Sequence, residues 1–166
     1  MSIAAGRQYS VAFDNVATTT TCDFLELNPA VDKPCRLVAI DIGQTTREGD
    51  ANEAILRWSI RRFTGATITS GSGGTAPTPS PLAAADAAAG AGAEVMNTTI
   101  ATTSGTNTLL HASTFNVRTG LLWVPPPNIY PWVVDNSGNA VLLVRLEEAP
   151  PASVNFSGTL YFEEFG

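Results

Sequence analysis

Charged side chains are scarce in this chain. Asp, Glu, Lys and Arg make up 14% of its 166 residues, against roughly 25% in an average globular domain. The net charge is −6, and the nine basic residues are dispersed apart from Arg57, Arg61 and Arg62. Nucleic-acid binding needs a basic patch that neutralises phosphates, so no direct nucleic-acid partner is expected. A surface with so few charges favours a subunit of a larger assembly.

Long apolar runs are also missing. No stretch reaches the roughly 18 residues that a membrane-spanning helix needs. The first ten residues, MSIAAGRQYS, lack the charged and apolar regions of a cleaved signal peptide. We therefore expect neither a membrane span nor secretion.

Cysteine and histidine are rare, with two and one in the chain. Cys22 and Cys35 are expected to be reduced thiols, with a disulfide as the alternative. A hairpin turning at residues 29–33 would place Cys35 opposite Glu26, too far from Cys22 for a normal bridge. His111 is expected to be a packed or hydrogen-bonded strand residue rather than a catalytic base or metal ligand.

Catalytic motifs are absent as well. The chain has no Gly-x-Ser-x-Gly elbow, no His-Glu-x-x-His pair and no phosphate-binding loop. The acidic residues Asp41, Glu48, Asp50 and Glu53 lack the ligand spacing of a calcium loop and indicate a solvated connection. We expect no enzyme activity, no cofactor and no metal.

Apolar and polar residues alternate in several parts of the chain. This period of two is typical of half-buried strands. In residues 54–63, for example, Leu56, Trp58 and Ile60 alternate with Arg57, Ser59 and Arg61. The predicted strands are residues 8–14, 20–27, 35–43, 54–63, 94–103, 108–117, 140–147 and 153–164, with 94–103 and 108–117 forming a hairpin. Val38, Ile40 and Ile42 are expected on one face. The fold class is all-β: one domain over 1–166, a jelly-roll-like antiparallel β-sandwich of about eight strands.

A long segment rich in Gly, Ser, Thr, Pro and Ala, residues 64–93, separates the first four strands from the last four. Pro77, Pro79 and Pro81 stiffen its middle, and its Ala-rich end has one or two helical turns as an option. We predict an ordered arm that lies against its own sandwich or a neighbouring subunit. Deleting residues 70–90 should then leave the fold intact and weaken assembly. Residues 1–7 are expected to form a flexible N-terminal arm.

An apolar segment with four prolines, residues 121–134, cannot be a central strand. It carries Trp123, Tyr130 and Trp132. Two interpretations stay open: a plug at the end of the sandwich, or a contact patch for a partner subunit or a carbohydrate. The outward-facing Arg57 and Arg61 either solvate the sheet or pair with acidic groups of a neighbour.

Several strings resemble a group of short tailed-phage proteins encoded among head genes: SGSGGTAPTP (70–79), AAADAAAGAGAEV (83–95), NTTIA (97–101), FNVRTGLLWVPPP (115–127) and SGTLYFEE (157–164). The resemblance implies a virion structural protein, and specifically a capsid decoration (cement) protein. It further implies a homotrimer that binds the major capsid protein, stabilises the shell from outside and assembles in the host cytoplasm. Partner contacts would then involve Trp123, Tyr130, Trp132, Arg57, Arg61, Pro77, Pro79 and Pro81. The alternative is a phage fibre, receptor-binding or carbohydrate-binding module.

Overall fold

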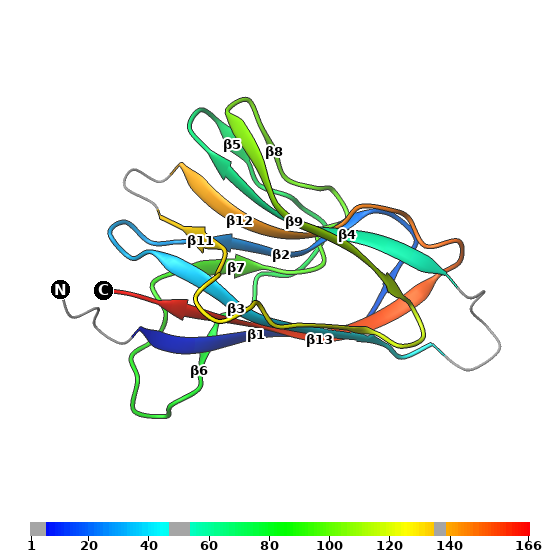
Figure 1. Cartoon of the computed structure of the whole chain (residues 1–166), viewed down its shortest axis with the longest axis horizontal. Helices are drawn as coiled ribbons and strands as arrows, with labels where there is room; N and C mark the ends of the chain where they lie inside the picture. The colour runs from blue at the N-terminus through cyan, green and yellow to red at the C-terminus, as the bar shows by residue number, and fades with distance from the viewer. Residues whose placement is uncertain (1–5, 47–53, 135–138) are drawn as a thin grey trace.

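The computed structural model describes residues 6–46, 54–134 and 139–166. These residues form antiparallel strands and contain no helix (Figure 1), so the predicted all-β class is confirmed. The strands are β1 (Arg7–Thr18), β2 (Cys22–Asn28), β3 (Cys35–Gln44), β4 (Ile55–Thr64), β5 (Ile68–Thr69), β6 (Ser80–Pro81), β7 (Gly92–Glu94), β8 (Thr102–Thr103), β9 (Thr106–Asn116), β10 (Leu121–Trp123), β11 (Trp132–Val133), β12 (Ala140–Leu146) and β13 (Val154–Glu164). The predicted helical turns in the Ala-rich stretch do not form.

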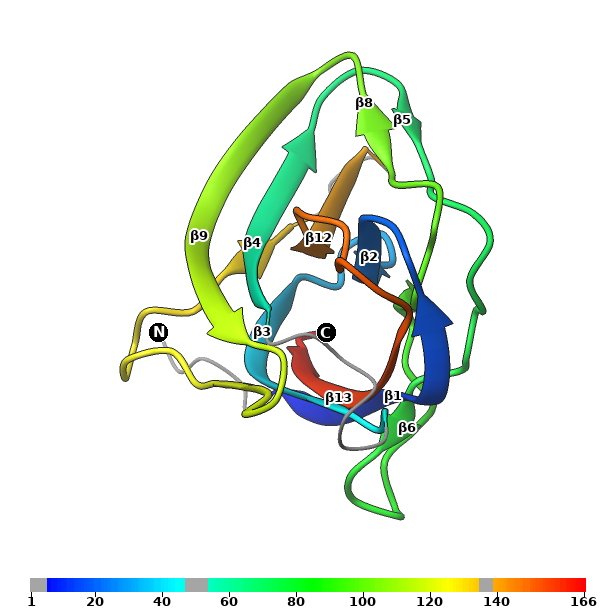
Figure 2. The ribbon, with the colours of Figure 1, turned by 90° about the vertical axis from the view of Figure 1, so that its right-hand side faces the viewer.

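Two sheets contain the long strands. The first, sheet A, has the order β10-β3-β13-β1-β6, and β11 also pairs with β3. The second, sheet B, has the order β7-β2-β12-β4-β9. The sheets stack face to face with the main hydrophobic core between them (Figures 1 and 2). The central strand of each sheet, β13 or β12, comes from the last part of the chain.

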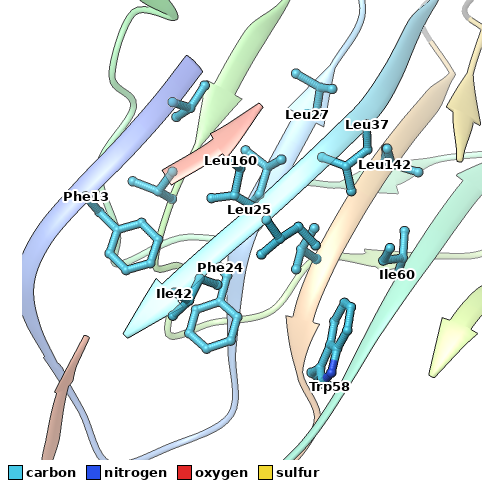
Figure 3. Packing of buried hydrophobic residues seen from close by; sticks show 14 of the residues in the cluster. Phe13, Phe24, Leu25, Leu27, Leu37, Ile42, Trp58, Ile60, Leu142 and Leu160 are labelled. Carbon is cyan, nitrogen blue, oxygen red and sulfur yellow. The ribbon is translucent and has the colours of Figure 1, made fainter. Parts of the chain in front are cut away.

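The core between the sheets follows the predicted alternation. On β4, Leu56, Trp58 and Ile60 are almost fully buried, and the inward positions of β1 and β13 are buried as well. Figure 3 shows side chains from both sheets interdigitating, among them Phe24 and Leu160. Phe24 also meets Phe156 of sheet A edge to face, with ring centroids 5.5 Å apart. Removing this apolar surface from water is the main stabilising contribution to the fold.

Bulges change the predicted face of single residues. In β3, Leu37 pairs with Phe162 and Ala39 with Tyr161, so Val38 is an extra residue. The prediction that Val38 shares a buried face with Ile40 was therefore wrong: Leu37 is buried and Val38 is only half-buried. An extra residue shifts the alternation by one, which moves every later side chain to the opposite face.

Two predicted hairpins do not form. β2 and β3 belong to different sheets, so Cys35 does not lie opposite Glu26, and the chain crosses between sheets at residues 29–34. Segment 94–103 does not pair with β9 either, because β9 pairs with β4. That segment is broken near Met96, whose φ of 58° interrupts an extended strand.

Residues 65–105, here called the excursion, leave β4 and return to β9. They carry β5 to β8 and run along the outside of β2 towards β1 before turning back (Figure 2). The outgoing limb pairs with the returning limb at Ser72–Thr99 and Thr75–Val95. The expected ordered arm is thus present, and in this chain it lies against its own sheets.

The excursion contributes core structure rather than a detachable arm. On the outer face of sheet B, Ala101 and Ile68 pack on Phe63, Val141 and Leu143 in a second small core. In addition, Ala91, Ala93, Val95 and Met96 are buried in the main core. These buried residues lie on both sides of residues 70–90, the part whose deletion is expected to leave the fold intact.

Candidate functional site

The proline-rich segment between β10 and β11 forms a loop along one edge of sheet A. Both flanking strands pair with β3, Trp123 opposite Ile40 and Trp132 opposite Arg36, so the loop leaves and returns to the same edge. Proline has no N–H to donate, so residues 124–131 cannot continue the ladder. The predicted exclusion from a central strand holds, since β10 and β11 are short edge strands.

Trp123 points into the molecule at this edge. Its ring meets Trp58 at 6.1 Å, edge to face, and His111 at 5.5 Å, while His111 and Trp58 are 4.9 Å apart. Burial lowers the pKa of His111, which keeps this imidazole neutral at neutral pH. Trp123 therefore packs against the core, as the plug interpretation requires, and His111 is a packed strand residue, as its position in the sequence predicts.

Tyr130 and Trp132 form a separate cluster around Arg36. The Arg36 guanidinium lies 4.3 Å from the Tyr130 ring centroid and 5.4 Å from that of Trp132. Arg36 also pairs with Glu163, with Nη2 2.5 Å from Oε2. Phe165 packs against Trp132 at 5.0 Å. The three aromatic residues thus belong to two clusters rather than to one flat platform.

A hollow of about 440 Å³ lies between these two clusters. Its lining is mostly apolar and consists of Leu110, His111, Trp123, Pro126, Ile129, Tyr130 and Pro131. Trp123 and Tyr130 both contribute, whereas Trp132 does not. In the same segment of the chain, Leu122, Val124 and Ile129 are 75%, 63% and 67% exposed, and of these Ile129 also lines the hollow. We call these three residues the apolar rim; exposed large apolar side chains close together in one segment are typical of interaction sites.

Arg57 and Arg61, the other predicted contact residues, lie on the outer face of sheet B and pair within the chain. Arg57 Nε lies 3.2 Å from Glu148 and Arg61 Nε 2.7 Å from Glu147. Burial alone would raise the pKa of Glu147, but hydrogen bonds from Ser59 and Arg61 hold that pKa below its usual range. A second hollow beside them is therefore lined by charges that are already paired.

The three prolines of the excursion lie far from the rim. Pro79 is buried, Pro77 is half-buried, and Pro81 pairs with Tyr9 in β6, at the opposite edge of sheet A from β10. The Tyr9 hydroxyl donates a hydrogen bond to the carbonyl of Ala87 at 2.9 Å. These contacts hold the excursion to its own sheet, so the predicted contact residues do not form one continuous surface.

The cysteines take no part in the site. Both are buried and free, which confirms the prediction of reduced thiols. Cys22 lies in sheet B and Cys35 in sheet A. Burial raises the pKa of each thiol to about 12, so neither is a thiolate at neutral pH.

The remaining predictions concern catalysis, metals and the termini. In residues 6–46, 54–134 and 139–166, no group of three or more His, Cys, Asp or Glu side chains could hold a metal. No helix of the described chain could cross a membrane. Three of the four acidic residues compared with a calcium loop, Glu48, Asp50 and Glu53, lie outside the described residues. Residues 1–5 of the expected N-terminal arm also lie outside them. Arg7, the last residue assigned to that arm, begins β1.

Sequence reasoning missed a group of buried charged side chains that lies beneath the excursion. Asp23 and Arg145 form a buried pair with distances of 2.5 and 3.0 Å, and both also bind the backbone of Ala101. Glu26 is fully buried nearby. Buried charges on a strand that otherwise reads as apolar, CDFLEL, are the sequence signal that could have predicted a cover over this face.

Comparison with protein-family models, with curated proteins and with solved structures found no match.

Proposed function

We propose that this protein is a virion structural protein, and specifically a decoration protein that binds the outside of a phage head and stabilises the shell. The observation that carries the proposal is the exposed apolar rim, of which Ile129 also lines the hollow. Leu122, Val124 and Ile129 are more than half exposed in a chain that buries most of its large apolar side chains. Anchors of this kind suit a contact with a protein surface of modest polarity, such as the major capsid protein.

We further propose that the fold is a jelly roll of eight principal strands. The strands β10-β3-β13-β1 would form one four-stranded sheet and β2-β12-β4-β9 the other. In chain order, β1 to β4 alternate between sheet A and sheet B, beginning in sheet A. From β9 in sheet B the alternation continues with β10 in sheet A, β12 in sheet B and β13 in sheet A. This arrangement supports a double Greek key, which occurs in viral capsid domains and in lectins. Fold analogy is compatible with several functions, so the rim remains the main support.

The experiment is co-sedimentation with undecorated shells assembled from the proposed partner, the major capsid protein. The protein should bind saturably, and Ile129→Asp should weaken binding at least tenfold by placing a charge in the apolar contact. Leu82→Asp is the matched control, since Leu82 is also exposed but lies on the excursion next to β6. Absence of co-sedimentation would overturn the proposal.

The second candidate is a carbohydrate-binding or receptor-binding module of a phage fibre. The hollow favours it, because Trp123 and Tyr130 offer aromatic faces and His111 a polar group at one site. Saturable glycan binding that is lost in Tyr130→Ala but kept in Trp132→Ala would support this function, since Trp132 does not line the hollow. Gene order adds a test: a neighbouring capsid gene favours decoration, and neighbouring tail genes favour a fibre.

A further inference from the structure

Two carboxylates lie side by side where the excursion meets sheet B. Glu26 of β2 and Glu94 of β7 are directly opposite each other in the antiparallel pair, so their side chains share one face. Both carboxylates accept from the same amide nitrogen, Asn97 Nδ2, at 3.5 Å for Glu26 and 2.8 Å for Glu94. Like charges opposite each other on neighbouring strands repel, so the pair destabilises this junction unless something compensates it.

The compensation is missing within the described residues. The positive charge closest along the strands, Arg145, is committed to Asp23, and none of the ion pairs in this part of the chain includes Glu26 or Glu94. The neutral Asn97 amide and the Gly71 N–H, 2.9 Å from Glu26 Oε2, are the donors to this pair. Neither carries a charge to offset the two carboxylates.

One oxygen of the pair has no partner at all. Glu26 is 0% exposed, and its Oε1 is buried without a hydrogen-bond partner. Buried polar atoms in native proteins are nearly always bonded, so an orphan acceptor on a buried carboxylate needs a partner such as a water or an ion. Glu94, the other carboxylate of the pair, is only half-buried.

We propose that Glu26 and Glu94 form a binding site for one divalent cation, Ca²⁺ or Mg²⁺, that fastens the excursion to sheet B. Both are hard cations that take oxygen ligands, and a partly hydrated ion needs only one or two carboxylates from the protein. Bound there, it neutralises the cross-strand repulsion and gives Glu26 Oε1 a partner. The site is distinct from the rim and does not depend on the proposed function.

The test is thermal unfolding of the metal-stripped full chain, followed by addition of Ca²⁺ or Mg²⁺ against Na⁺ at equal ionic strength. We expect one divalent ion to raise the Tm by about 5–10 °C at a concentration a hundredfold above its Kd. Titration calorimetry should give one ion per chain. Absence of any shift or heat with either ion overturns the proposal.

Two variants test whether the ion binds at Glu26 and Glu94. Glu94→Gln should lose the Tm shift, while its metal-free Tm equals or exceeds that of the stripped wild type because the repulsion is gone. Glu148→Gln, at an exposed ion pair with Arg57, is the matched control and should keep the full shift. If Glu94→Gln also keeps the shift, the ion binds elsewhere and the proposal is wrong.

Discussion

At the scale of single residues, the buried pair of Asp23 and Arg145 offers the sharpest test of how the outer face of sheet B is stabilised. Removing one partner leaves an uncompensated buried charge, so Arg145→Met should lower the free energy of unfolding by about 3–5 kcal/mol. The double variant Asp23→Leu/Arg145→Met should recover part of that loss, because neither charge of the pair remains, although Ala101 loses both of its side-chain partners. Urea unfolding measures both.

The exposed pair of Arg57 and Glu148 is the control for that cycle. Arg57→Met should change stability by no more than about 0.5 kcal/mol, since exposed pairs contribute little. Equal losses for Arg57→Met and Arg145→Met would contradict the role assigned to burial.

His111 should make stability depend on pH. Burial places its folded pKa below the 6.5 of a free imidazole, so the unfolded chain takes up a proton first as the pH falls. Stability is therefore full above pH 6.5 and declines as the pH falls below it. His111→Gln should flatten the slope of the unfolding free energy between about pH 7 and 5.5. Identical slopes in the two proteins would show that another group titrates.

Residue positions were predictable wherever a strand is regular. Period-two alternation placed Trp58 and Ile60 in the core correctly, because the pleat repeats every second residue. It failed at Val38, because a bulge depends on the partner strand, which the local sequence does not contain. At Gly158 the strands approach too closely for a side chain, since a Cβ there would lie 2.8 Å from Ile42 and 2.9 Å from Phe13.

At the scale of elements, the excursion should contribute directly to stability. Deleting residues 70–90 removes the four backbone hydrogen bonds of the Ser72–Thr99 and Thr75–Val95 bridges. At about 1 kcal/mol each, the expected loss is about 4 kcal/mol in the free energy of unfolding. Deleting only residues 83–85, in the exposed tip, should be nearly neutral. Equal stability of the 70–90 deletion and the wild type would mean that the excursion is a dispensable arm.

Strands were easier to predict than their partners. β4 and β13 alternate over much of their length, whereas β12 is a nearly continuous apolar run buried at every position. The bounds of all three differ little from the prediction. The excursion escaped this method, because its pairs are two or three residues long or single bridges. Periodicity needs more residues than that to appear. The hairpin predicted for β9 failed because its true partner, β4, lies before the excursion.

At the scale of the whole molecule, the proposed homotrimer predicts a solution mass three times that of the chain. Sedimentation equilibrium measures it. Because the rim is proposed to contact the shell, Ile129→Asp should remain trimeric while losing shell binding. A monomer that stays monomeric on the shell would contradict the trimer, and dissociation of Ile129→Asp would move the rim to the subunit interface.

The sequence was informative about the class of fold and much less so about the surface. Proline and tryptophan marked residues 121–134 as unusual, and the rim and the hollow lie there. Which aromatic residues would share the hollow depended on the pairing of β10 and β11 with the same strand, β3. That pairing separates Trp132 from Trp123 and could not be read from spacing.

The position of β12 and β13 has a consequence for synthesis. Each is the central strand of its sheet, yet both follow all the other strands of the described chain. Until they are made, β1 has no strand that joins it to β3, and β2 has none that joins it to β4. Formation of both sheets is therefore dominated by pairings between distant parts of the chain, which makes folding slow.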